Sequence, residues 1–197
     1  MKLIYPLLLS GICFSAKAQL KQGDWNFGTS TNAPFNLQLK KNNAGLRSYD
    51  FSFHPQFGYM LKGRWEIGGG PVFGFNGSRF KDGSGNTIWK SNSQSVGASL
   101  FTRYYFKSSG KLVPYLVAGI QYTHEKGTSI DLNSTKYSYS QNLWQLKAGG
   151  GLNWFVSPRT ALFTELTYTG DWGSGNGYLN GLNLQLGIRF YFGKKKK

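Results

Sequence analysis

Cysteine, charge and long apolar runs are all scarce in this chain of 197 residues. A single cysteine excludes a disulfide scaffold and a cysteine-based zinc site. The only two histidines lie far apart in the sequence, so we expect no metal and no cofactor. No apolar run reaches the roughly 18 residues that a membrane-spanning helix needs, which excludes a helical-bundle membrane protein.

Charged residues make up only 16% of the chain, whereas aromatic residues make up 17% and glycine occurs 27 times. An average soluble domain has roughly 25% charged residues. The aromatic content argues against global disorder, because disordered chains are poor in aromatic residues. Lysine and arginine outnumber the acids by 23 to 8. The length is that of a single domain.

The N-terminus has the pattern of a secretory signal peptide. Lys2 precedes an apolar stretch over residues 3–14, and the small residues Ala16 and Ala18 follow it. This stretch is too short to span a membrane, and the small residues are typical of a cleavage site. We therefore expect a signal peptide over residues 1–18, one domain over residues 19–193 and a basic tail over residues 194–197. Export of the chain makes a nucleic acid an implausible partner.

Alternation of apolar and polar residues with a period of two runs through the rest of the chain, which predicts β-strands. In the clearest stretch, Tyr49, Phe51 and Phe53 share one face, and Ser52 and His54 share the other. Eight such stretches occur, at residues 25–30, 48–59, 65–75, 95–106, 115–123, 144–154, 162–168 and 182–192. Together they predict an all-β fold.

The connections between these stretches alternate in length. Three are short, at residues 61–63, 107–111 and 157–159. Four are longer and rich in Gly, Ser, Asn and Thr, at residues 31–47, 76–94, 124–142 and 169–179. We expect the longer ones to be polar loops. The regular alternation predicts an antiparallel up-and-down meander, with the short turns at one end and the long loops at the other.

Alternation alone fits either a soluble barrel with its apolar face inside or a membrane barrel with that face outside. The apolar faces carry no charge, glycines collect on the polar faces, and aromatic residues such as Trp144 and Trp154 lie near strand ends. These features favour a membrane barrel with a crowded lumen and two interfacial aromatic belts. The prediction is a closed eight-stranded antiparallel up-and-down transmembrane β-barrel, since a sheet in lipid must close.

Charged residues on the polar faces are the candidate site, because an isolated charge in a narrow lumen is costly. Glu66 and Arg103 lie on neighbouring predicted strands, as do Glu165 and Arg189, and we expect each pair to form an ion pair within a lumenal polar network. Lys147 lies nearer the loop end and is either hydrated or close to Asp50. His54 is expected in the same network. The hypothesis is a polar plug that fills the barrel.

The last predicted strand, from Gln185 to Phe192, resembles the C-terminal targeting signal of bacterial outer-membrane barrels. Gly187, Phe190 and Phe192 occupy the glycine and aromatic positions of that signal. The chain resembles the small outer-membrane β-barrel family that includes OmpX and the OmpA membrane domain, and its basic ending is similar to barrels of the Bacteroidetes type. The resemblance implies insertion by the β-barrel assembly machinery, with both termini in the periplasm. One departure is that Phe192 is not the terminal residue.

The function that this pattern predicts is structural and non-enzymatic. The barrel contacts outer-membrane lipid, and its long outward loops bind a protein partner, a host surface or lipopolysaccharide. One alternative is an accessory subunit of a secretion or uptake complex in the outer membrane. A small-solute pore is another. A lipid-modifying enzyme is the last alternative, with His124, Glu125 and Ser129 as its conceivable catalytic residues.

Overall fold

The computed structural model describes residues 20–32, 45–108, 110–131, 135–172 and 181–193. Within these residues the chain is almost entirely β-strand, with one short 3-10 turn, η1 (Lys62–Arg64). The strands are β1 (Trp25–Asn32), β2 (Gly45–Met60), β3 (Trp65–Lys81), β4 (Thr87–Tyr105), β5 (Leu112–Ile130), β6 (Lys136–Ser157), β7 (Thr160–Trp172) and β8 (Gly181–Phe192). No helix in the described ranges is long and apolar enough to cross a membrane.

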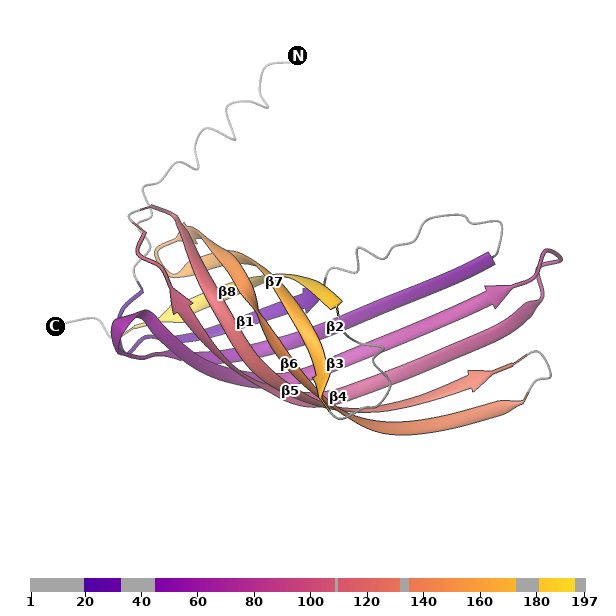
Figure 1. Cartoon of the computed structure of the whole chain (residues 1–197). Coiled ribbons are helices and arrows are strands. Elements are labelled where there is room, and N and C mark those ends of the chain that lie inside the picture. The colour runs from indigo at the N-terminus through magenta and orange to yellow at the C-terminus, as the bar shows by residue number, and fades with distance from the viewer. Residues whose placement is uncertain (1–19, 33–44, 109, 132–134, 173–180, 194–197) are drawn as a thin grey trace, which may run out of the picture.

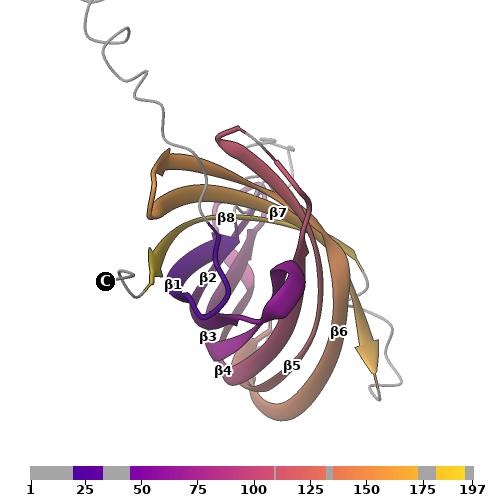
Figure 2. The ribbon, with the colours of Figure 1, turned by 90° about the vertical axis from the view of Figure 1, so that its left-hand side faces the viewer.

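Each strand pairs antiparallel with its neighbours in sequence, and β1 also pairs with β8, so the sheet closes into a barrel (Figures 1 and 2). This topology confirms the predicted closed eight-stranded antiparallel fold. The start of β1 lies beside the ends of β2 and β8, because Trp25 pairs with both Tyr59 and Phe192. The three short connections lie at this end, which we call the short-turn end.

The two faces of the barrel wall differ sharply in chemistry. Successive side chains of a strand point alternately outward and into the lumen. Large apolar side chains on the outer face are exposed, for example Leu100 at 65% and Leu182 at 72%. By contrast, Glu66 and Arg103 face the lumen and have no exposed surface. The structure thus confirms the predicted face assignment, which is the reverse of a soluble barrel.

Glycines let the strands and lumenal side chains approach closely. A Cβ atom added at Gly149 of β6 would lie 2.1 Å from the carbonyl oxygen of Leu166 on β7. At Gly97 of β4, an added Cβ would lie 1.9 Å from the carbonyl oxygen of Tyr122 on β5. Real Cβ atoms do not approach backbone this closely, so these positions require glycine. This crowding is the physical reason for the glycine-rich polar faces of the sequence.

Strands β2 to β6 continue far beyond the rest of the barrel (Figure 1). The predictions of polar loops at residues 76–94 and 124–142 are therefore wrong: residues 76–81, 87–94, 124–130 and 136–142 continue the strands and pair as two long hairpins. Both faces of the hairpins are mostly polar, so the apolar alternation stops while the strands continue. We call residues 76–94 and 124–142 the extension, of which 132–134 are not described.

The turn at the tip of the β3–β4 hairpin shows how the sequence reverses the chain. The Asp82 carboxylate accepts hydrogen bonds from the backbone N–H groups of Ser84 (2.9 Å) and Asn86 (2.8 Å). Gly85 has a φ angle of 87°, which favours glycine.

Several expectations fall outside the described residues. These are the signal peptide over residues 1–18, the basic tail over residues 194–197, and most of the predicted loops at 31–47 and 169–179.

Candidate functional site

The lumen near the short-turn end holds a buried network centred on Arg103 of β4. Its guanidinium lies 3.0 Å from Glu66 Oε1 of β3 and 3.2 Å from Glu165 Oε2 of β7, and all three side chains are fully buried. Arg103 Nη2 also donates a hydrogen bond of 2.7 Å to Gln56 Oε1 of β2. One side chain thereby connects four strands of the barrel.

Arg189 of β8 joins the same network through hydroxyl and amide groups. Its Nη1 donates to the Tyr105 hydroxyl oxygen (3.1 Å) and to Asn153 Oδ1 (2.9 Å). The Tyr105 hydroxyl in turn donates to Glu66 Oε2. Asn153 Nδ2 donates to the Tyr191 hydroxyl oxygen at 2.9 Å. Two arginines and two glutamates thus share one connected polar cluster.

Aromatic rings complete the surroundings of both arginines. The Arg103 guanidinium carbon lies 3.9 Å from the centre of the Phe101 ring, and that of Arg189 lies 4.1 Å from the centre of the Phe163 ring. Stacking of this kind offsets part of the desolvation cost of a buried cation. It is most relevant for Arg189, whose Nε and Nη2 have no hydrogen-bond partner among the described residues.

The charged residues on the polar faces of the sequence predict part of this arrangement. The Glu66–Arg103 ion pair is present, on directly opposite residues of β3 and β4. The expected Glu165–Arg189 pair is replaced by contacts of Glu165 with Arg103 and with the Tyr115 hydroxyl group at 3.1 Å. The register explains the difference, because Arg189 lies opposite Ala161, four residues before Glu165.

Sequence reasoning gave no role to Gln56, Tyr105, Tyr115 or Asn153. The signal was available, because each of them occupies a lumen-facing position of the same period-two pattern as the charged residues. Their contacts follow from the width of the barrel, which the alternation does not specify.

His54 and Lys147 lie further along the lumen, where they line a polar cavity of about 190 Å³. Both side chains are buried, with exposed fractions of 4% and 6%. Neither Lys147 Nζ nor His54 Nδ1 has a hydrogen-bond partner among the described residues. Asp50 lines the same cavity but forms no ion pair with Lys147 in the described structure. Lys147 was expected to be either hydrated or close to Asp50, and the second of these, an ion pair with Asp50, is not seen among the described residues.

The lumen between this cavity and the short-turn end is filled with side chains. Met60, Tyr105, Tyr115 and Phe155 pack together there with at most 1% of their surface exposed. Their packing around the arginine network blocks the lumen near the short-turn end. The described residues contain no cluster of His, Cys, Asp or Glu that could hold a metal ion. The chemistry available in the lumen is charge pairing and hydrogen bonding between strands.

The structure does not assemble the conceivable catalytic group of His124, Glu125 and Ser129. Adjacent residues of a strand point to opposite faces, and His124 lies on the outer face while Glu125 lies on the inner face. Glu125 accepts hydrogen bonds from the Tyr139 hydroxyl (3.1 Å) and from Gln141 Nε2 (3.0 Å). Burial raises the pKa of the Tyr139 phenol above its usual value, and the nearby Glu125 carboxylate acts in the same direction.

His124 instead contacts two residues of β6 on the outer face. Its Nδ1 lies 2.7 Å from Asn142 Oδ1, and its Nε2 lies 3.4 Å from Ser140 Oγ. The three side chains are a Ser–His–Asn group, a combination that can support nucleophilic catalysis when its geometry is tight. This group is exposed, and its Ser–His distance is long for proton transfer.

The residues of the expected assembly signal lie on β8, at the seam with β1. Phe192 pairs with Trp25, and Phe190 pairs with Phe27. Gly187 leaves room for the ring of Phe163, since an added Cβ would lie 2.5 Å from it. These residues therefore take part in closing the barrel.

Known proteins resemble this chain in structure rather than in sequence. No family model matches it, and no curated protein sequence matches it. One similar structure is that of Ail, the attachment invasion locus protein of Yersinia pestis, in complex with the heparin analogue sucrose octasulfate. Its sequence is 12% identical and its TM-score is 0.50, and the match covers 87% of this chain and 100% of the Ail chain. The outer membrane protein OprG from Pseudomonas aeruginosa is 15% identical with a TM-score of 0.50, over 88% of this chain and 98% of its own. At such identities the likeness shows a shared fold.

Proposed function

We propose that this chain is an integral outer-membrane protein whose barrel is a membrane anchor and whose extension is an outward binding surface. The observation that carries the proposal is the reversed distribution of side chains. Leu100 is 65% exposed on the outer wall, whereas Glu66 and Arg103 are completely buried in the lumen. Such a wall suits the hydrocarbon of a bilayer, and closure of the sheet satisfies the backbone groups that lipid cannot.

The height of the apolar wall supports the same proposal. Trp144 and Trp154 are both exposed on β6, at 49% and 52%, and are separated by ten residues. Ten residues of a strand tilted by about 40° cover about 25 Å along the membrane normal, which is the height of the apolar band of outer-membrane barrels. Trp144 packs against Tyr122 with ring centres 4.9 Å apart, as expected for an interfacial belt.

In this proposal the short-turn end faces the periplasm and the extension faces outward. The Gly187, Phe190 and Phe192 pattern of β8 supports insertion by the β-barrel assembly machinery. The buried arginine network acts as a plug that links strands, which favours an anchor over a small-solute pore.

Cysteine labelling in intact cells tests this orientation. Gly83→Cys lies in the exposed turn of the extension, and Lys62→Cys lies in the exposed turn at the short-turn end. A membrane-impermeant maleimide should label Gly83→Cys in intact cells and Lys62→Cys only after the outer membrane is opened. Equal labelling of both variants in intact cells would contradict the orientation, and recovery of the protein in a soluble fraction would contradict the membrane location.

Hydrolysis of a lipid ester is a second candidate, favoured by the contacts of His124 with Ser140 and Asn142. In that case Ser140→Ala should change the acyl-chain composition of the outer-membrane lipid, as measured by mass spectrometry. The anchor proposal expects an unchanged composition, so this comparison decides between the two candidates.

A further inference from the structure

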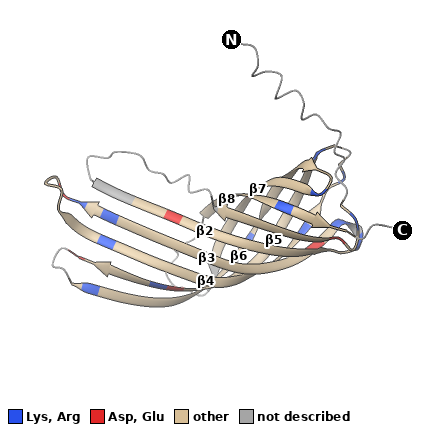
Figure 3. Cartoon of the chain, turned by 180° about the vertical axis from the view of Figure 1, so that it is seen from behind, with Lys and Arg blue, Asp and Glu red and all other residues tan. Residues whose placement is uncertain are grey.

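Charge on the extension is separated by face. The outer face, which continues the lipid-facing wall, carries several basic side chains, among them Arg79, Lys90, Lys126 and Lys136. The acids of the extension are elsewhere. Glu125 lies on the inner face, and Asp82 and Asp131 bind backbone groups of their own turns. Figure 3 shows the bands of Lys and Arg on neighbouring strands of the extension.

Three of these cations lie in one row across the sheet. Arg79 of β3 is directly opposite Lys90 of β4, Lys90 is opposite Ile130 of β5, and Ile130 is opposite Lys136 of β6. Like charges on directly opposite residues destabilise a sheet. The two ion pairs seen among the described residues lie in the lumen, and neither involves this row. Its electrostatic cost falls when an anion binds from outside.

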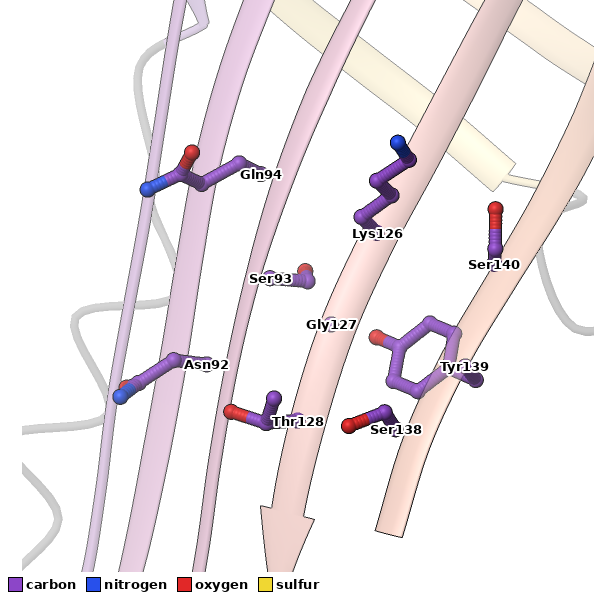
Figure 4. Close-up of a pocket in the computed structure, with 9 residues that line it drawn as sticks. All are labelled: Asn92, Ser93, Gln94, Lys126, Gly127, Thr128, Ser138, Tyr139 and Ser140. Atoms are coloured by element: carbon purple, nitrogen blue, oxygen red, sulfur yellow. The ribbon is translucent and has the colours of Figure 1, made fainter.

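A polar depression of about 540 Å³ lies between this row and the aromatic belt (Figure 4). It is lined on the outer face by short hydroxyl and amide side chains and one ammonium group, those of Asn92, Gln94, Lys126, Thr128, Ser138 and Ser140. Gly127 lies at the floor of the depression. The ring of Tyr139 packs against Gly127, where a Cβ atom added to the glycine would lie 2.4 Å from the ring. Hydroxyl and amide groups suit sugar hydroxyls, and an ammonium group suits a phosphate.

The position of these features relative to the bilayer selects the kind of anion. On β6 the depression begins at Ser140, four residues beyond Trp144 of the aromatic belt, and the basic row lies four residues further, at Lys136. With a strand tilt of about 40°, these steps correspond to heights of about 10 Å and about 20 Å above the belt. A phospholipid headgroup layer is only about 5–8 Å thick, so the row lies above it.

We propose that the outer face of the extension binds the phosphorylated, sugar-containing headgroup of a large anionic glycolipid in the outer leaflet. Lys126 and the hydroxyl groups of the depression hold the part of the headgroup nearest the membrane. Arg79, Lys90 and Lys136 hold phosphate groups further out. The acyl chains continue downward along the apolar wall past Tyr122 and Trp144. This assignment rests on the proposed membrane location and names the partner of the outward surface.

Binding of purified protein in detergent to lipopolysaccharide tests the assignment directly. The variant is Arg79→Gln/Lys90→Gln/Lys136→Gln, and the matched control, Lys62→Gln/Lys107→Gln/Lys111→Gln, removes three charges at the short-turn end. The first variant should bind lipopolysaccharide at least about tenfold more weakly than the wild type, and the control should bind like the wild type. Resistance of the folded barrel to unfolding in SDS verifies that both variants are folded.

Two further ligands identify what is recognised. Lipopolysaccharide with its phosphates removed should bind the wild type as weakly as intact lipopolysaccharide binds the triple variant. Heparin represents a soluble polyanion without acyl chains and should bind more weakly than lipopolysaccharide. The assignment is overturned if the triple variant binds like the wild type, if phosphate removal has no effect, or if heparin binds more tightly. The binding experiments use purified protein, whereas the membrane location is tested by cysteine labelling and fractionation of cells. A wrong membrane location and a wrong ligand assignment therefore give different results.

Discussion

Arg103 of β4 reaches across the barrel lumen to Glu165 of β7, with 3.2 Å between Nη2 and Oε2. The same guanidinium holds Glu66 of the neighbouring strand at 3.0 Å. One buried cation therefore neutralises carboxylates from opposite sides of the barrel. Such a contact forms only when the barrel is closed, so it links the stability of the network to closure.

Replacing Arg103 by methionine should strongly destabilise the barrel. Two buried carboxylates would lose their partner, and breaking a buried ion pair in this way typically costs about 3–5 kcal/mol. Urea unfolding in lipid vesicles, followed by tryptophan fluorescence, measures the change. Arg79→Met is the control, since Arg79 is exposed on the extension and its loss should change stability by less than about 0.5 kcal/mol. Equal effects of the two substitutions would argue against a stabilising network.

The hydroxyl group of Tyr105 has a measurable role of its own. It accepts a hydrogen bond from Arg189 and donates one to Glu66. Tyr105→Phe keeps the ring but leaves both charged groups without this partner, so a loss of about 1–3 kcal/mol in unfolding free energy is expected. Tyr104→Phe is a matched control on the preceding residue, whose ring packs against Trp65 on the outer wall. A similar loss for both variants would show that the hydroxyl link is unimportant.

The sequence was sufficient to predict the strand faces and the neighbouring ion pair. Period-two alternation separates lumen from wall. Glu66 and Arg103 lie near the same end of two neighbouring strands, the short-turn end, and this position brings them opposite each other. The contact of Arg103 with Glu165 could not be predicted in this way. It depends on the diameter of the barrel and on the register around it, which no local pattern of residues encodes.

The loop prediction for the extension fails for a related physical reason. Apolar alternation marks a strand only where one of its faces contacts lipid or a core. From Asn76 to Gln94 and from His124 to Asn142 both faces are mostly polar, so the pattern resembles a loop although the backbone ladder continues. Tyr137 and Tyr139 were the available sign, because alternating tyrosines favour strands.

Close packing of lumenal backbone makes Gly149 intolerant of any side chain. Gly149→Ala would place a Cβ 2.1 Å from the Leu166 carbonyl oxygen, and relief of this clash requires β6 and β7 to separate. We expect the variant to lose most of the SDS-resistant folded form seen as a mobility shift on unheated gels. Gly83→Ala is the control, since no heavy atom lies within 4 Å of its added Cβ. Normal folding of Gly149→Ala would mean that the strands at this position are more widely spaced.

A charge on the outer wall tests the lipid-facing assignment most directly. Leu100 is 65% exposed and lies in the middle of the apolar wall, so in water Leu100→Arg would cost almost nothing. In a bilayer an arginine near the midplane of a barrel wall costs about 2–4 kcal/mol. We therefore expect Leu100→Arg to lower the unfolding free energy in vesicles by this amount. Asn92→Arg changes an exposed residue of the same strand and face within the extension, and it should have almost no effect. If both variants were as stable as the wild type in vesicles, the apolar wall would not be in contact with lipid.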